Sequence, residues 1–249
     1  MLKTIFITGA TSGIGKAAAL ILGKQGHTII ACGRRAERLE ELKTELSQHT
    51  TVHTLTFDVR YNNEVLAAVN SLPADVEIDV LINNAGNAHG LSPIHEGDIE
   101  DWDAMIDINV KGLLYVTRAI APQMVARQKG YIINIGSIAG REVYPNGNVY
   151  TASKHAVNAL NEAMRIDLNA AGIKVSQIAP GAVNTEFSNV RFKGDQAKAD
   201  KVYEGYDALS AQDIAELIDF MISRPYHVNL ADVLILPTAQ AKAALIRKD

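Results

Sequence analysis

Two side chains four residues apart, Tyr150 and Lys154, have the types and spacing of a proton-transferring pair. On a helix this spacing puts both on one face, so their head groups can converge on one ligand. A phenol with a pKa near ~10 is a useful base at neutral pH only if its pKa falls by about 3 units, roughly 4 kcal/mol. One ammonium at ~4 Å, in an effective dielectric near 20, supplies about that much. We therefore expect Lys154 to lower the pKa of Tyr150.

A glycine-rich segment stands at the end of the first expected strand, directly before a helix, and reads Thr8-Gly9-Ala10-Thr11-Ser12-Gly13-Ile14-Gly15. Glycines permit positive φ and let a phosphate approach the backbone, while the free N–H groups of a helix start attract anions. The segment predicts a phosphate-binding turn, with a plain glycine-rich turn as the alternative. The expected contacts are Gly9, Thr11, Ser12, Gly13, Ile14 and Gly15.

The end of the second expected strand, Cys32-Gly33-Arg34-Arg35, indicates which nucleotide the turn binds. Folds that prefer NAD have an acid here to accept the ribose 2′-OH, whereas NADP needs positive charge for its 2′-phosphate. No acid is present, Gly33 leaves space, and two guanidiniums can bind phosphate oxygens in pairs. The expected cofactor is NADP, bound by Arg34 and Arg35. Both arginines could instead belong to the charged face of the following helix.

Further signals follow in chain order: Asn83-Asn84-Ala85-Gly86, Asn109, Ser137 and Pro180-Gly181. Together with the glycine-rich segment and the Tyr150 and Lys154 pair, they resemble the short-chain dehydrogenase/reductase family across essentially the whole chain. The resemblance implies hydride transfer between a nicotinamide cofactor and a carbon that bears a hydroxyl group.

The resemblance also implies a role for each candidate catalytic residue. Tyr150 takes the hydroxyl proton as hydride leaves, and returns it in the reverse direction. Ser137 donates a hydrogen bond to the substrate oxygen. Lys154 holds the nicotinamide ribose, and Asn109 positions a water that completes the proton relay. Asn109 could instead be a helix irregularity or a capping side chain.

The remaining cofactor contacts are implied by the same resemblance. Asp58 and Val59 are expected to meet the adenine, although Asp58 could instead cap the turn that follows it. Asn84, Ala85 and Gly86 are expected to contact the ribose side of the cofactor. Its carboxamide end is expected to contact Pro180, Gly181, Val183 and Thr185.

The run from Thr185 to Asp195 is similar to NADP-dependent 3-hydroxy acid dehydrogenases, which act on serine, allo-threonine and related hydroxy acids or semialdehydes. A carboxylate that leaves water must be neutralised or well hydrogen-bonded, and Arg191 is the expected partner. Lys193 and Arg141 are alternatives, and each could be merely solvated. Arg141-Glu142 departs from the pattern of these enzymes. An uncharged ketone, aldehyde or sugar therefore stays open as substrate, as does a nucleotide-binding protein without turnover.

These side chains must be positioned by strands and helices that alternate around a parallel sheet. Short β-branched runs predict seven strands, at Lys3–Thr8, Thr28–Cys32, Val52–Asp58, Val80–Asn83, Tyr131–Ile135, Lys174–Ala179 and Val233–Leu236. Amphipathic runs predict helices at Ile14–Gln25, Glu37–Gln48, Glu64–Ser71, Ile99–Arg127, Val149–Ala171 and Ala211–Ser223. We expect one α/β domain over residues 1–249, a Rossmann-type doubly wound sheet with helices on both faces. Its ligands bind at the carboxyl ends of the strands.

Four segments are expected to act beyond this sheet. Residues 180–208 are irregular and charged, which predicts a lid over the substrate, with a solvated insertion as the alternative. The two long helical runs carry more apolar surface than one sheet face requires, and in the resembled family they form dimer contacts within tetramers. We therefore expect a homotetramer or homodimer, with burial of this surface in the ordinary core as the alternative. Residues Ala239–Asp249 add to such contacts or fray.

Composition excludes several classes of protein. The 249 residues carry 24 Lys and Arg against 28 Asp and Glu, a net charge of −4, so no nucleic-acid partner is expected. The single Cys32 and the scattered histidines predict neither a disulfide nor a metal site, and fit a reducing compartment. No run suits a signal peptide or a membrane span, so we expect a cytoplasmic enzyme with a small-molecule substrate and no membrane partner.

Overall fold

The computed structural model describes all 249 residues, and its main sheet has seven strands in the order β3-β2-β1-β4-β5-β6-β9. The strands are β1 (Thr4–Thr8), β2 (Thr28–Gly33), β3 (Val52–Thr56), β4 (Val80–Asn83), β5 (Tyr131–Ile135), β6 (Lys174–Pro180) and β9 (Asp232–Ile235). Every neighbouring pair is parallel. The chain moves outward from β1 to β3 and returns to β4, and a ligand crevice opens where the order reverses. The predicted fold class is confirmed.

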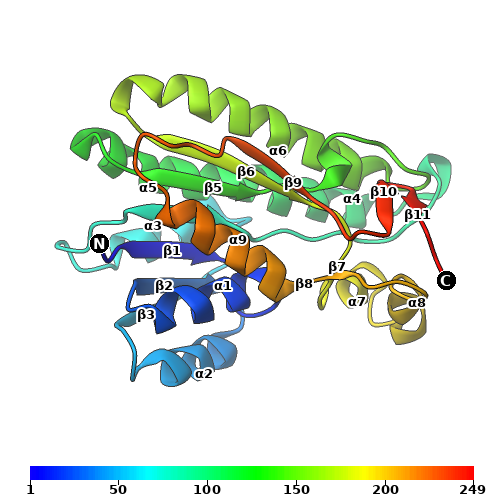
Figure 1. Cartoon of the computed structure of the whole chain (residues 1–249), viewed down its shortest axis with the longest axis horizontal. Coiled ribbons are helices and arrows are strands. Elements are labelled where there is room, and N and C mark those ends of the chain that lie inside the picture. The colour runs from blue at the N-terminus through cyan, green and yellow to red at the C-terminus, as the bar shows by residue number, and fades with distance from the viewer.

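Helices cover both faces of the sheet, as Figure 1 shows. One face carries α1 (Gly13–Lys24), α2 (Ala36–Leu46) and α9 (Ala211–Ser223). The other carries α3 (Asn62–Asn70), α5 (Leu113–Arg127) and α6 (Asn148–Asp167). No helix combines the length and the apolar character that crossing a membrane requires.

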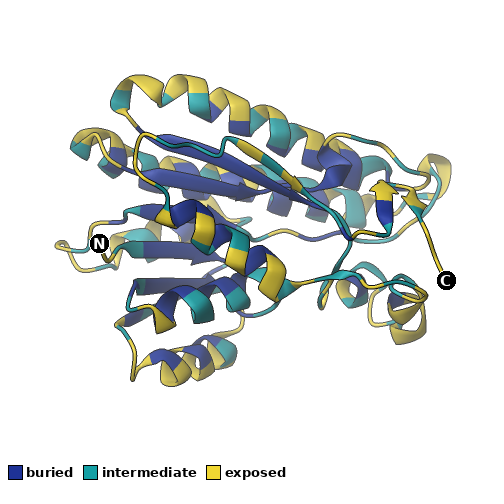
Figure 2. Cartoon of the chain, viewed as in Figure 1, coloured by how far each residue is buried: buried dark blue, intermediate teal, exposed yellow.

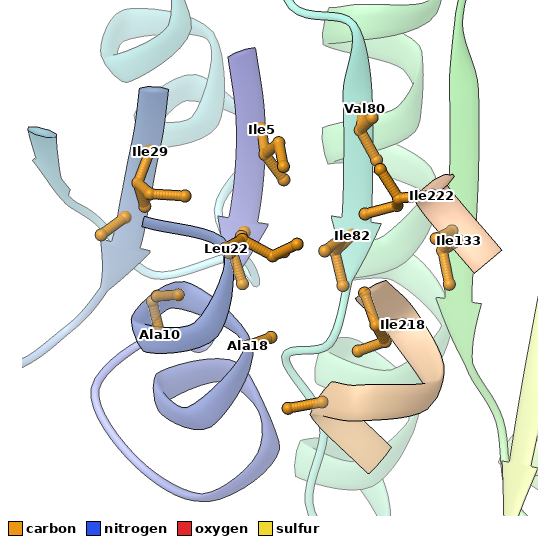
Figure 3. Packing of buried hydrophobic residues seen from close by; sticks show 14 of the residues in the cluster. Ile5, Ala10, Ala18, Leu22, Ile29, Val80, Ile82, Ile133, Ile218 and Ile222 are labelled. Atoms are coloured by element: carbon orange, nitrogen blue, oxygen red, sulfur yellow. The ribbon is translucent and has the colours of Figure 1, made fainter. Parts of the chain in front are cut away.

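Burial follows this layering, with the central strands almost wholly dark blue in Figure 2. On the first face Leu22 of α1 and Ile218 of α9 pack against strand residues such as Ile5 and Ile82, all fully buried (Figure 3). Because both faces of these strands are covered, they read as continuous apolar runs rather than as alternating ones. The core thereby fixes the strand ends from which the candidate residues project.

The run predicted as one helix over Ile99–Arg127 is divided in the structure. It consists of α4 (Ile99–Ile106), a π-helical segment η2 (Asp107–Gly112) and α5. A π-helical turn contains an extra residue and is frequent at functional sites. The sequence left a helix irregularity at Asn109 as an alternative, but hydrophobic spacing does not show that it is a π-helical turn or where this turn begins and ends. The turn contains Asn109.

Other predicted boundaries differ by a few residues. The strand predicted over Val52–Asp58 ends at Thr56, which leaves Asp58 in the following loop. The helix predicted over Val149–Ala171 ends at Asp167, followed by the single turn η4 (Asn169–Ala171) and by Gly172 at φ +71°. Only glycine adopts such a φ readily, so the helical path stops there. Short turns η1 (Ile94–Glu96) and η3 (Ile138–Gly140) were not predicted.

The lid segment and the C-terminal segment are both more ordered than predicted. Residues 180–208 contain β7 (Val183–Asn184) and two short helices, α7 (Phe187–Arg191) and α8 (Gln196–Lys201). After β8 (Leu209–Ser210) and β9, the chain ends in a hairpin of β10 (Gln240–Lys242) and β11 (Leu245–Ile246). The backbone N–H of Asp249 donates to the carbonyl of Gly205 at 2.9 Å, so the end of the chain packs against the lid segment instead of fraying.

Candidate active site

A cavity of about 330 Å³ lies at the carboxyl ends of the strands and collects most of the predicted residues. It is lined by Gly9, Thr11, Ser12, Gly13, Ile14, Arg34, Arg35, Asp58, Val59, Asn84, Ala85, Gly86, Ser137, Tyr150, Lys154, Pro180, Gly181, Val183 and Thr185. Three predicted residues stand outside this lining, namely Gly15, Asn109 and Arg191. The glycine-rich turn and the Tyr150 pair therefore share one cavity although they are far apart in the chain.

The glycine-rich turn has the backbone expected of a phosphate site. Gly9 and Gly13 adopt φ of +67° and +51°, and α1 begins at Gly13 without a side chain capping its first N–H groups. Such unpaired groups carry partial positive charge toward the cavity. Gly15 does not face it, because a Cβ there would collide with the Gly9 carbonyl oxygen and the Asn84 amide. Gly15 serves close packing and does not line the cavity, and its predicted contact with the cofactor stays a prediction.

The two arginines at the end of β2 differ in their partners. Arg34 has a side chain 61% exposed and lies 3.6 Å from a carboxylate oxygen of Asp58. Arg35 donates from Nε and Nη2 to Thr11 Oγ1 and from Nη2 to Ser12 Oγ, at 2.8–3.0 Å. Its Nη1 donates to Glu186 at 2.9 Å. Arg34 is thus the freer of the two to meet a ligand.

Asp58 combines the two possibilities that its sequence position left open. It lines the cavity, and its Oδ1 also accepts a hydrogen bond from the backbone of Arg60 at 3.0 Å, which caps the turn. Burial raises the pKa of this carboxyl, but the hydrogen bonds and charge of Arg60 outweigh burial and lower it overall. An ionised Asp58 therefore faces the cavity near Arg34.

Ser137, Tyr150 and Lys154 converge on the cavity from β5 and α6. All three are at most 9% exposed. Lys154 Nζ donates to the carbonyl of Ile135 at 3.0 Å, and Ser137 Oγ accepts from the N–H of Ala139 at 3.0 Å. Because Tyr150 and Lys154 lie one turn apart on α6, the predicted shared face is what the structure shows.

The expected lowering of the Tyr150 pKa by Lys154 is wrong. Burial raises the pKa of Tyr150 to about 12, and the largest effect in the opposite direction is the charge of Arg191. Burial also lowers the pKa of Lys154 to about 8. The charge argument omitted desolvation, which disfavours both the phenolate and the ammonium.

Asn109 acts behind the cavity wall. Its Oδ1 accepts from the N–H of Asn87 at 2.8 Å, and its Nδ2 donates to the Asn87 carbonyl at 2.8 Å and to Ser153 Oγ at 3.0 Å. The side chain is 2% exposed. Asn109 therefore fixes the loop after β4, whose residues line the cavity.

Arg191 lies on the far side of the Tyr150 ring. Its guanidinium carbon is 4.9 Å from the ring centroid, and Nη2 donates to Tyr144 OH at 2.9 Å. Arg191 and Tyr150 both line a second cavity of about 260 Å³, so Tyr150 separates the two spaces. Arg191 Nε is buried and has no hydrogen-bond partner.

Both alternative cations form ion pairs within the chain, and Lys193 also lines the second cavity. Lys193 pairs with Asp98 and Asp101 at 3.2 and 3.0 Å, which ties the end of α7 to the start of α4. Arg141 pairs with Asp232 and lines neither cavity. The neighbouring Glu142 accepts from the N–H of Ala243 at 2.8 Å. The departure at Arg141-Glu142 thus fixes the C-terminal segment rather than the substrate space.

Sequence reasoning missed part of the lining, notably Asn87, Ile108, Glu186, Phe187 and Val190. Asn87 follows Asn84-Ala85-Gly86 directly, and that adjacency was the one available signal. Nothing in the sequence pairs Glu186 with Arg35, because the two are 151 residues apart. Such contacts appear only once the chain is folded.

Comparison with known proteins shows which family and which relatives this chain is similar to. A family model described as short chain dehydrogenase matches residues 3–196. The NADP-dependent 3-hydroxy acid dehydrogenase YdfG of Salmonella typhi is 47% identical over 243 residues, 97% of each chain. Sulfoacetaldehyde reductase 2 of Chromohalobacter salexigens is 44% identical over 246 residues, 98% of each chain.

Solved structures give the same picture. The closed form of a serine dehydrogenase complexed with NADP+ has a TM-score of 0.93 and 45% identity, and the match covers 99% of both chains. Serine dehydrogenase from Escherichia coli has a TM-score of 0.83 and 39% identity over 96% of this chain.

Proposed function

The chain belongs to the short chain dehydrogenase family, and on that basis we propose that it transfers a hydride between NADP(H) and a 3-hydroxy acid or the corresponding semialdehyde or keto form. Serine, allo-threonine and 3-hydroxypropionate are the substrates to test. The observation that carries the proposal is that one cavity is lined by both the glycine-rich turn and the Ser137, Tyr150 and Lys154 set.

NADP fits the residues that line this cavity. The positive-φ glycines and the uncapped start of α1 suit a pyrophosphate. The exposed guanidinium of Arg34 and the nearby Arg35 suit the 2′-phosphate. When bound, the nicotinamide supplies the site that accepts or gives up the hydride. The remaining contacts are assigned to Asp58 and Val59, to Asn84, Ala85 and Gly86, and to Pro180, Gly181, Val183 and Thr185.

The chain's own residues move the proton and orient the substrate. Tyr150 transfers the proton of the reacting oxygen, and its raised pKa keeps the phenol protonated at neutral pH, the form that carbonyl reduction requires. Ser137 donates a hydrogen bond to the same oxygen. Lys154, with a pKa of about 8, carries its charge at neutral pH and binds the nicotinamide ribose. Asn109 fixes the loop beside them and orders the water of the relay.

Arg191 is assigned to the substrate's anionic group. It lies against Tyr150 on the side of the second cavity, and its Nε has no partner within the chain. The names of two relatives, a 3-hydroxy acid dehydrogenase and a sulfoacetaldehyde reductase, both describe molecules with an anion near a hydroxyl or carbonyl carbon. An uncharged substrate was left open because of Arg141 and Glu142. Both residues have partners within the chain, so they no longer favour such a substrate.

The proposal extends to the whole molecule. Residues 180–208 act as the substrate lid of a single domain over residues 1–249. The outer sides of α5 and α6 expose Leu114, Val125 and Ile166, which supports assembly as a homotetramer or homodimer. The single Cys32 is buried and unpaired, in keeping with a cytoplasmic location.

The test is a substrate panel with NADP and with NAD. Purified protein incubated with serine, allo-threonine or 3-hydroxypropionate at alkaline pH should raise the absorbance at 340 nm, more strongly with NADP. Arg191→Ala should chiefly raise KM for these acids, whereas Arg247→Ala, which removes a side chain 77% exposed and remote from the site, should not. No gain in absorbance with any of the acids would remove the substrate assignment.

A further inference from the structure

Glu186, the residue before α7, forms two ion pairs. Its Oε2 accepts from Arg35 Nη1 at 2.9 Å, and its Oε1 accepts from Arg38 Nη1 at 2.7 Å. Burial raises the pKa of Glu186, but hydrogen bonds and charge from the two arginines outweigh burial and lower it overall. The carboxylate is therefore ionised throughout the neutral pH range, and each of its oxygens has a cationic partner.

Arg35 extends this contact to the glycine-rich turn. Besides Glu186, it donates to the hydroxyls of Thr11 and Ser12. Thr11, Ser12, Arg35 and Glu186 all line the cofactor cavity, and Glu186 enters it from the lid segment. A continuous chain of hydrogen bonds thus joins the phosphate-binding turn to the start of the lid.

Arg35 both contacts the lid segment and lines the cofactor cavity, whereas Arg38 only contacts the lid segment. It lies in the first turn of α2 and contacts Glu186, but it does not line the cavity. A change at Arg38 therefore weakens the attachment of the lid without removing a group that faces the cofactor.

We propose that Glu186 is a positioning residue for the cofactor: its ion pairs with Arg35 and Arg38 hold the lid against the opposite wall of the cavity and slow dinucleotide release. This inference rests on the proposed function in taking NADP(H) as the occupant of the cavity. Glu186 must break its ion pairs with Arg35 and Arg38 before the lid segment can move away from the opposite wall of the cavity. Because the three side chains are 42–47% exposed, the pairs slow release by about three- to tenfold rather than by orders of magnitude.

Charge alone predicts the opposite result. A carboxylate close to the 2′-phosphate repels it, so removing the carboxylate would slow NADPH release. NADH lacks that phosphate and would be unaffected. Attachment of the lid acts on both dinucleotides, because both occupy the same cavity beneath it.

The experiment measures dinucleotide release by stopped-flow fluorescence, with bound NADPH or NADH displaced by an excess of the oxidised form. The variants are Glu186→Gln, Arg38→Gln and the double variant. Glu37→Gln is the matched control, because it removes an exposed carboxylate from the same turn of α2 without touching the lid. Thermal unfolding of each variant verifies that it is folded.

Glu186→Gln should release both NADPH and NADH about three- to tenfold faster, with the Glu37→Gln control unchanged. Arg38→Gln should give part of that increase, and the double variant no more than Glu186→Gln alone, because both changes break one attachment. Unchanged release, slower release, or a change confined to NADPH would overturn the inference while leaving the proposed function intact. A wild-type protein that fails to bind NADPH would instead overturn the proposed function, and this inference with it.

Discussion

Burial of the Tyr150 phenol sets the expected pH dependence of the reaction. Its pKa is raised to about 12, so at neutral pH the group holds its proton and the phenolate is scarce. Oxidation of a hydroxy acid needs the phenolate, and the phenolate fraction grows tenfold per pH unit below the pKa. Reduction needs the protonated phenol, which is already fully populated.

Between pH 6 and 7, below the pKa of Lys154 and where most of its ammonium is charged, kcat/KM for oxidation should therefore rise by close to one log unit per pH unit. Reduction should change little over the same range. Initial rates in both directions check this, with Tyr150→Phe as the inactive control. Oxidation that is independent of pH from 6 to 7 would contradict the assignment of Tyr150 as the proton acceptor.

Lys154 should trade stability for activity. Burial lowers its pKa from 10.5 in water to about 8. Below pH 8 Lys154 is therefore protonated in the folded protein, although the unfolded chain binds this proton more tightly. Carrying that charge costs about 3 kcal/mol at pH 7, and the cost vanishes as pH rises from 8 to 10.5. Lys154→Met removes the cost and also the hydrogen bond to the Ile135 carbonyl, worth about 1 kcal/mol.

The Lys154→Met variant should therefore be inactive yet more stable by about 1–2 kcal/mol at pH 7. Urea unfolding at pH 7 and at pH 10.5 measures this, and the advantage should disappear at the higher pH. If the difference in stability between Lys154→Met and the wild type is the same at both pH values, the ammonium is not desolvated.

At the scale of one residue, motif and spacing predicted which side chains gather at the site, but not how burial acts on them. Tyr150 and Lys154 were placed on one face of a helix, and the structure confirms it. The sign of the Tyr150 pKa shift was wrong, because the degree of burial depends on lid residues such as Phe187 and Arg191, which no local pattern connects to it.

At the scale of elements, Gln240 shows how the C-terminal hairpin supports the site. Gln240 is 6% exposed, and its Oε1 accepts the N–H of Ala182 at 2.8 Å. Ala182 stands between Gly181 and Val183, which line the cofactor cavity. Gly181 leaves the space for this contact, because a Cβ there would meet the Gln240 side chain.

Gln240→Ala should destabilise the protein by about 1–3 kcal/mol, since it leaves the Ala182 N–H unpaired, and should weaken NADPH binding. Gln212→Ala, which removes an exposed side chain of α9 bonded only to Glu216, should do neither. Thermal unfolding and NADPH titration measure the two effects. Normal NADPH binding together with lost stability would show that the hairpin supports the fold but not the site.

Elements with strong periodicity were predicted well, and those held by distant contacts were not. The helix over Ala211–Ser223 has the predicted bounds, because Ser210 and Asp213 form a capping box at its start. The π-helical turn around Asn109 and the hairpin at the C-terminus were missed. Their backbones are fixed by partners such as Asn87 and Glu142, which lie far away in the chain.

At the scale of the whole molecule, the sequence predicted the seven-stranded sheet, but it did not predict which apolar side chains lie on the outer surface of the chain. A doubly wound parallel sheet buries both faces of its strands, so β-branched runs identified all seven. The outer surface follows no such rule. Exposed apolar side chains on α5 and α6, among them Leu114 and Ile166, are 38% and 69% accessible in the single chain.

These exposed side chains predict that the protein assembles through α5 and α6. Light scattering coupled to size exclusion should give a dimer or tetramer, because a stable interface of about 1,200–2,000 Å² would cover both helices. Replacing Leu114 and Ile166 together by Glu would bury two unpaired charges, at a cost of roughly 3–5 kcal/mol each, and should divide the assembly into smaller species. The matched control is Leu66→Glu, which adds a charge at a 41% exposed position of α3, beyond the two helices, and should leave the mass unchanged. A wild-type protein that elutes as a monomer, or a double variant with the wild-type mass, would show that the apolar surface of these helices is not an interface.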